Sequence, residues 1–105
     1  MMNPWILLTL AGVFEIIWAT TMKYSDGFNN IIPSIVTGIT AFLSFWLLAM
    51  AMKDLPLGTA YVVWVGIGAM GAAIVGIIAF GDAITPMRIG GIALIAAGVA
   101  ALKLA

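Results

Sequence analysis

Residues 4–23 read PWILLTLAGVFEIIWATTMK, and this stretch decides the fold. From Pro4 to Met22 its only charged side chain is Glu15, which lies about halfway along. An α-helix rises about 1.5 Å per residue, so about 20 apolar residues cross the roughly 30 Å hydrocarbon core of a bilayer. The stretch therefore predicts a membrane-spanning helix with one carboxyl group at the depth of the lipid tails.

The composition of the whole chain supports a membrane protein. Of its 105 residues, 65% are hydrophobic and 8% are charged, whereas soluble domains carry about 25% charged residues. The chain has no Cys and no His, which removes disulfides, thiolate metal sites and the usual proton shuttle. We expect no metal, no cofactor and no nucleic-acid partner. Four spans leave no room for a soluble catalytic domain, so we do not expect an enzyme.

Charged and turn-forming residues divide the chain into apolar blocks at about 4–22, 31–52, 57–80 and 87–102. Open sheet edges and irregular loops cannot face lipid, so these blocks predict an all-α fold of four transmembrane helices in a single domain, residues 1–105. No basic region precedes the first block, and we expect it to be retained as a span and not removed as a signal peptide. Pro56 suits the first turn of the third helix.

The basic residues give no preference for one orientation in the membrane. An even number of helices places Lys53 and Lys103 on one side and Lys23 and Arg88 on the other. The positive-inside rule needs an excess on one side, and the tie favours insertion both ways and an antiparallel, dual-topology homodimer. The alternative is that the insertion machinery or a partner fixes one orientation.

Glu15 is the first candidate functional residue. An ionised carboxylate at the centre of a membrane helix costs about 3 kcal/mol on insertion scales, and such residues usually face a bundle interior or an aqueous cavity and are functional. A carboxyl group there can hold a proton or a cation in turn. The alternative is a protonated Glu that only holds helices together. Residues three and four apart share a helix face, which places Gly12 and Trp18 beside Glu15.

A second polar and aromatic stripe is predicted on the third helix, at Tyr61, Trp64 and Gly68. Aromatic faces attract cations by about 0.5–2 kcal/mol, and a buried carboxylate supplies the counter-charge. Together the two stripes indicate a pocket for a small organic cation. The alternative for Tyr61 and Trp64 is an aromatic belt at the membrane interface.

Small and hydroxyl residues complete the set of candidates. Gly66 and Gly68 weaken the third helix enough to serve as a hinge, and Gly90 and Gly98 offer a helix-packing surface on the fourth. Ser44, deep in the second block, has two possible hydrogen-bond partners: the Glu15 carboxylate or its own backbone.

The chain resembles the small multidrug resistance family over essentially its whole length. The resemblance rests on Glu15 in the first span, MKYSDGF at 22–28, SFWLLA at 44–49, LPLGTAYVVW at 55–64 and the GxG at 66–68. It implies four helices per protomer, an antiparallel homodimer or a pair with a paralogous subunit, and proton-coupled export of cations. It also implies that Glu15 is the shared proton and substrate site and that Tyr61 and Trp64 line it.

Within that family, the chain looks most like the guanidinium exporter branch. The run GVFEIIWA at 12–19 puts Trp18 one turn after Glu15, and GIGAMGAAIVGI follows at 66–77. The match implies that Gly12, Trp18 and Ser44 form a polar network around the carboxylate. One departure concerns substrate choice: the motif usually reads YAxW followed by Thr or Ser, and here Val65 follows Trp64.

These observations lead to one functional hypothesis and its alternatives. We expect a proton-coupled antiporter of the cell inner membrane that exports guanidinium or small substituted guanidines, with proton and cation competing for Glu15. A broader quaternary ammonium exporter is the alternative within the family. A small dual-topology ion channel and a rotary ATPase ring subunit are the alternatives outside it, the second disfavoured by four spans. Asp82 and Arg88 are read as solvated helix ends without an assigned role.

Overall fold

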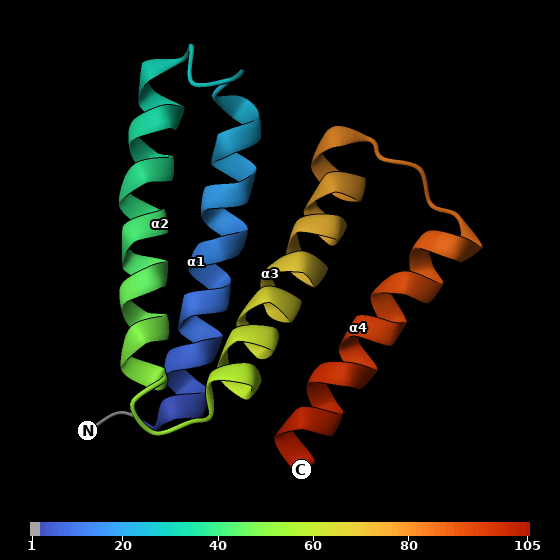
Figure 1. The fold of residues 1–105 in the computed structure, drawn as a ribbon. Coiled ribbons are helices and arrows are strands. Elements are labelled where there is room, and N and C mark those ends of the chain that lie inside the picture. Colours follow the sequence, from blue (N-terminus) through green and yellow to red (C-terminus); the bar gives the residue numbers. More distant parts are fainter. Residues whose placement is uncertain (1–2) are drawn as a thin grey trace.

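The computed structural model describes residues 3–105, which form four α-helices joined by short loops (Figure 1). These are α1 (Pro4–Tyr24), α2 (Ile31–Ala51), α3 (Leu57–Phe80) and α4 (Pro86–Leu104). Each is long and apolar enough to cross a membrane. The predicted all-α fold with four spanning helices is confirmed. Residues 1 and 2 of the predicted domain lie outside the described residues.

The predicted blocks fall within two residues of the helix ends, and side-chain caps set the starts of α1 and α4. The Asn3 side chain accepts a hydrogen bond from the Trp5 amide at 2.8 Å, which starts α1 at Pro4. Thr85 caps α4 in the same way, accepting from the Arg88 amide at 3.1 Å, so α4 begins at Pro86. Pro at the first helical position is favourable because its missing N–H needs no partner there. The expectation for Pro56 is wrong: it lies at the N-cap, just before the first turn of α3.

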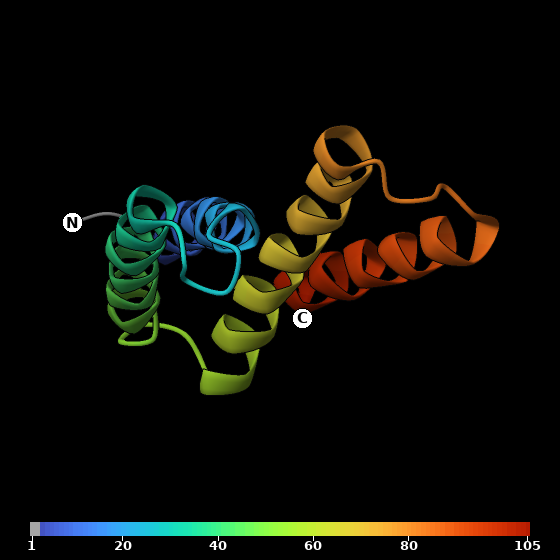
Figure 2. The same cartoon turned by 90° about the horizontal axis from the view of Figure 1, so that it is seen from above.

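α1 is the central helix of the protomer. It packs against α2 along most of its length and against α3 on its other side, whereas α2 and α3 touch little. Figure 1 shows this order, with α2, α1, α3 and α4 following one another across the view. The view from above shows α3 crossing obliquely beside the α1–α2 pair (Figure 2). The protomer is accordingly thin, measuring 39 × 35 × 17 Å.

α4 stands apart from the other helices. In the part of the chain that the structure describes, its backbone approaches only α3, and none of its residues is buried. Only its C-terminal end comes back toward α1, where the Lys103 ammonium lies 5.5 Å from the centre of the Trp5 ring. A helix that is apolar all round needs lipid or another helix to cover it.

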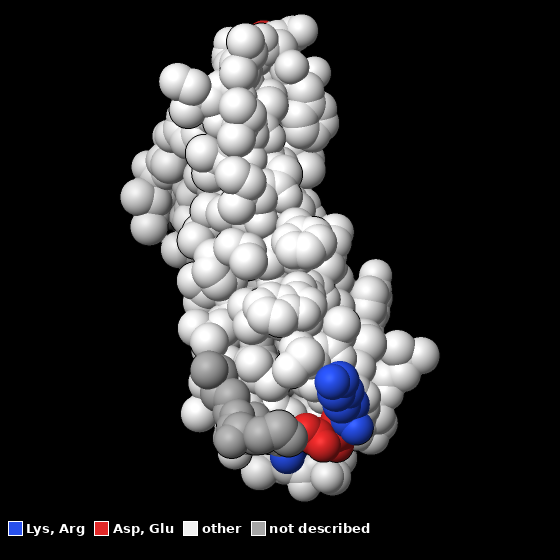
Figure 3. Space-filling model, turned by 90° about the vertical axis from the view of Figure 1, so that its left-hand side faces the viewer, with Lys and Arg blue, Asp and Glu red and all other residues white. Residues whose placement is uncertain are grey.

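The charged side chains other than Glu15 lie at the ends of the helices or in the loops. Lys23, Asp26, Asp82 and Arg88 belong to the end that holds the α1–α2 and α3–α4 loops, and the remaining three belong to the other end. On the face shown in Figure 3, charged atoms are visible only near the two ends, and a white uncharged surface separates them. This distribution matches a bundle whose middle lies in hydrocarbon.

Candidate functional site

Glu15 lies in the seam between α1 and α3. Its partner across the seam is Gly68: a methyl group on Gly68 would overlap the Glu15 carboxyl group. Gly68 is itself buried. The sequence placed Gly68 on the stripe of Tyr61 and Trp64, and in the structure the Glu15 carboxyl group fills the space that a side chain at Gly68 would take.

Two polar atoms in this region are buried without a partner. Within residues 3–105, neither Glu15 Oε1 nor Trp18 Nε1 has a hydrogen-bond partner, although both are shielded from solvent. Glu15 and Trp18 are separated by one helical turn on α1. Most buried polar groups in proteins are hydrogen-bonded, and an unpaired one costs about 1–3 kcal/mol. The Glu15 acceptor and the Trp18 donor lie in adjacent turns of α1. A group that bonds to either of them removes the cost of an unpaired buried atom, so binding here is favourable.

Ser44 joins three helices through hydrogen bonds. Its hydroxyl on α2 donates to the Ala11 carbonyl oxygen on α1 at 2.6 Å and accepts from the Trp64 indole N–H on α3 at 2.9 Å. Both partners predicted for Ser44 are wrong in this structure, because it bonds neither Glu15 nor its own helix. The Ala11 carbonyl precedes Glu15 by one turn, so Ser44 holds the segment of α1 that carries the carboxyl group.

Trp64 belongs to the protein interior and not to an interfacial belt. Its side chain is only 6% exposed and packs with Leu8, Ala11 and Val63 in the hydrophobic core. Tyr61, one turn earlier on α3, is half exposed and lies against Trp64 with ring centroids 5.5 Å apart. Of the two predicted aromatic residues, Trp64 is thus packed in the core, and Tyr61 has an accessible face.

Phe45 is a residue of the site that the sequence reasoning missed. Its ring lies edge-on to Trp18, at 6.2 Å between centroids, and edge-on to Trp64, at 5.7 Å. It therefore connects the aromatic residue of α1 to those of α3, and with Tyr61 the four rings form a continuous series. Helical spacing gave no signal for Phe45, because it follows Ser44 directly and adjacent residues do not share a helix face.

Gly66 and Gly68 face two different helices. A methyl group on Gly66 would overlap Val99 of α4, whereas one on Gly68 would overlap Glu15 of α1. Gly12 of α1 is required in the same way, since a methyl group there would overlap the side chain of Ile67. α3 continues without interruption from Leu57 to Phe80. Close packing on both sides explains the GxG pair, and its role as a hinge remains a prediction.

Gly90 and Gly98 have no packing partner inside the protomer. No described atom lies within 4 Å of the position that a methyl group would take on either residue. They do not pack α4 against α3, and their predicted role in helix pairing depends on a surface outside this chain.

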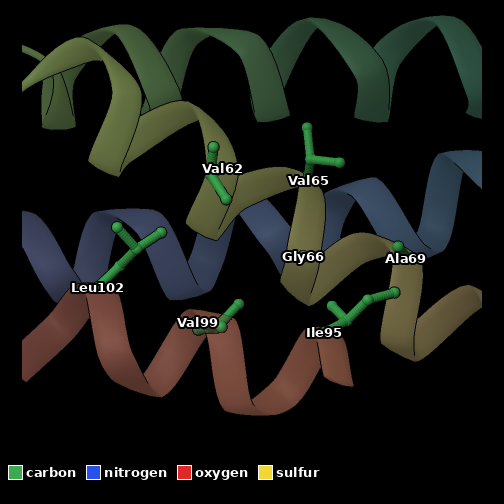
Figure 4. Close-up of a pocket in the computed structure, with 8 residues that line it drawn as sticks. Val62, Val65, Gly66, Ala69, Ile95, Val99 and Leu102 are labelled. Atoms are coloured by element: carbon green, nitrogen blue, oxygen red, sulfur yellow. The ribbon is translucent and has the colours of Figure 1, made fainter. Parts of the chain in front are cut away.

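The groove between α3 and α4 is apolar and separate from Glu15. Its volume is about 390 Å³. Figure 4 shows the side chains that line it, including Val62 and Val65 from α3 and Ile95, Val99 and Leu102 from α4. Val65 lines this groove, and its effect on substrate choice remains a prediction.

The fold and the site together define a class of protein. Four apolar helices make up the described chain, and α1 and α3 hold one partly buried carboxyl group between them, beside an indole that is unpartnered among the described residues and a series of aromatic rings. Such an arrangement can bind one small cation by charge, hydrogen bonds and π faces. This is a multi-pass membrane protein with an intramembrane carboxylate site.

Comparison with known proteins gives the family. Residues 3–95 match the family described as Small Multidrug Resistance protein. The chain is 51% identical over 100 residues to the guanidinium exporter of Escherichia coli strain K12, covering 95% of each chain. It is 52% identical over 101 residues to the guanidinium exporter of Yersinia pseudotuberculosis, covering 96% of this chain and 97% of the relative. The chain belongs to the small multidrug resistance family of transporters.

Proposed function

We propose that this protein is a proton-coupled antiporter that exports guanidinium or small substituted guanidines through the cell inner membrane. The observation that carries the proposal is the Glu15 carboxyl group, which is buried in a membrane span with Oε1 unpartnered among the described residues. Relatives that are about half identical over nearly the whole chain are guanidinium exporters, which supports the choice of substrate.

The geometry around Glu15 suits a planar cation. Guanidinium groups pair with a carboxylate through two parallel N–H···O bonds and stack on aromatic faces. Glu15 supplies the carboxylate, and the series Trp18, Phe45, Trp64 and Tyr61 supplies the faces. The Trp18 indole N–H cannot bond a guanidinium, because both are donors. We therefore assign it to a Glu15 carboxylate oxygen, which keeps a second lone pair when the substrate takes one site on each oxygen.

Exchange follows from competition at one group. A proton and an organic cation both need the ionised form of Glu15, so binding of one excludes the other. Alternating access to the two sides of the membrane requires an inward-facing and an outward-facing state of nearly equal free energy. An antiparallel homodimer supplies them, because exchanging the roles of its two protomers converts an inward-facing form into an outward-facing one.

Transport in proteoliposomes tests the proposal. An imposed guanidinium gradient should drive proton movement in the opposite direction, measured with a pH-sensitive dye inside the vesicles, and Glu15→Gln should abolish both fluxes. Asp54→Asn, which removes a carboxylate from the α2–α3 loop, is the matched control and should transport normally. Guanidinium flux without proton movement would support a channel and overturn the exchanger.

The same assay separates the two substrate classes. If tetramethylammonium drives proton exchange as well as guanidinium does, the protein is a general exporter of organic cations. Selective response to guanidinium is the expected result, since a quaternary ammonium cannot donate hydrogen bonds to Glu15.

A further inference from the structure

The α1–α3 seam also holds a cavity that lies between Glu15 and the end of the bundle. Its volume is about 200 Å³, room for several waters at about 30 Å³ each. Ala19 and Ala72 line its inner part. They follow Glu15 and Gly68 by four residues, which is one turn on α1 and on α3 respectively. The cavity therefore begins one turn from the carboxyl group, in the same seam.

The outer part of this cavity holds one acidic, one basic and one aromatic side chain. They are Asp82 from the α3–α4 loop, Lys23 from the last turn of α1, and Phe80 at the end of α3. The Lys23 ammonium lies 5.6 Å from the centre of the Phe80 ring, a cation–π contact. These are the elements that bind a small organic cation, and Lys23 supplies the cation from within the chain.

The backbone fixes the Asp82 carboxylate at this place. Gly81 adopts a left-handed conformation (φ 69°), and the Asp82 amide donates to the Gly76 carbonyl oxygen at 3.0 Å, closing the end of α3. The carboxylate folds back onto α3, where a methyl group on Gly76 would overlap it. A negative charge at a helix C-terminus is electrostatically unfavourable. Helix stability therefore does not explain the position of the Asp82 carboxylate.

We propose that this cavity is an outer binding site for small organic cations, in which Asp82 supplies the charge, Phe80 supplies the π face, and Lys23 is a tethered cation that the substrate displaces. The site would collect a guanidinium-type cation at the membrane surface and hand it to Glu15 one turn deeper. The proposal rests on the proposed function only in taking small organic cations as substrates.

Two substitutions with opposite effects test the transport role. Asp82→Asn should raise the KM for guanidinium about tenfold with little change in kcat. Lys23→Gln should lower the KM several-fold, because it removes the competing cation. Lys103→Gln is the matched control: Lys103 also lies over an aromatic ring, Trp5, but no carboxylate is among the described residues that line its cavity. It should leave the KM unchanged.

The neighbouring Arg88 distinguishes a binding role from a structural one. Asp82 also lines a cavity that it shares with Arg88 of α4. If Asp82 only ties α4 to α3 through Arg88, Arg88→Gln will reproduce the effect of Asp82→Asn, and equal losses of kcat will accompany both. That result would overturn the proposal.

Binding to a transport-inactive variant separates this proposal from the proposed function. Glu15→Gln protein in lipid nanodiscs should show saturable NMR shifts of the Lys23 and Asp82 amides on titration with guanidinium chloride, with sodium chloride as the reference. The shifts should vanish in Glu15→Gln/Asp82→Asn. Equal responses to the two salts would overturn the outer site whether or not the wild type exchanges guanidinium for protons. Saturable shifts would support the site even if the exchange assay failed.

Discussion

Ser44 contributes more to the site than its size suggests, because its hydroxyl is bonded to two other helices. Replacing it with Ala removes the hydrogen bond to the Ala11 carbonyl and leaves the buried Trp64 N–H without an acceptor. An unsatisfied buried donor costs about 1–3 kcal/mol. We expect Ser44→Ala to lower the free energy of unfolding by about that amount, measured by denaturation in detergent micelles.

A partly exposed serine provides the control for Ser44. Ser34 bonds only the Asn30 carbonyl at the start of α2, at 2.6 Å. Ser34→Ala should change stability by no more than about 0.5 kcal/mol. Equal effects of the two substitutions would show that the bridge between helices contributes nothing beyond a local bond.

Gly68 is the second residue on which the position of Glu15 depends. In Gly68→Ala the new methyl group overlaps the carboxyl group, so either the side chain or the seam must move. We expect guanidinium uptake to fall at least about tenfold, a loss of about 1.4 kcal/mol in binding or in the barrier. Gly58→Ala on the same helix, where open space surrounds the glycine, should retain wild-type uptake. Wild-type uptake by Gly68→Ala would remove Gly68 from the site.

At the scale of single residues, the sequence indicated which residues belong to the site better than it indicated which residues contact one another. Glu15 was identified because a charge in a long apolar run is expensive whatever surrounds it. The partners of Ser44 were not, because helical periodicity assigns a face but not the residue that a neighbouring helix presents there. Phe45 and the direction of Val65 depend on how α2 and α3 are rotated, which a single sequence does not specify.

At the scale of helices, the four spans followed directly from charge and length, whereas the start of α4 at Pro86 depends on the Thr85 cap, which the apolar pattern did not indicate. The order of the helices in space did not follow. Gly66 and Gly68 predict close approach, but only the packing of α3 between α1 and α4 explains why two glycines are needed two residues apart. The isolation of α4 was likewise outside the reach of sequence patterns.

α4 is the element whose surface most needs a partner. Gly90 and Gly98 are open within the protomer, and small residues on membrane helices favour close helix pairing. We expect substitutions at Gly98 to weaken self-association in proportion to size, with Gly98→Ala milder than Gly98→Leu. Energy transfer between labelled protomers in liposomes measures this.

The folded protomer provides the control for the Gly98 series. No described atom beyond the local α4 backbone lies within 4 Å of a methyl group added at Gly98, and the longer leucine side chain has the α3–α4 groove beside it. Gly98→Ala and Gly98→Leu should therefore leave the helical content of the protomer unchanged by circular dichroism. Undiminished energy transfer in Gly98→Leu would place the dimer contact on another helix.

At the scale of the whole molecule, the even distribution of basic residues predicts insertion in both orientations. Each end of the bundle carries two Lys or Arg residues, so the charge rule gives no preference.

The chain has no cysteine, which allows single labelling sites to be added. Asn29→Cys in the α1–α2 loop and Ala105→Cys at the opposite end should each react to about half with a membrane-impermeant thiol reagent in intact cells. Adding two lysines beside Asn29 should turn that loop toward the cytoplasm and reduce its labelling, while labelling at Ala105→Cys rises. Complete labelling of one site and none of the other in the unaltered background would show a single orientation, and an antiparallel pair of identical chains would then be impossible.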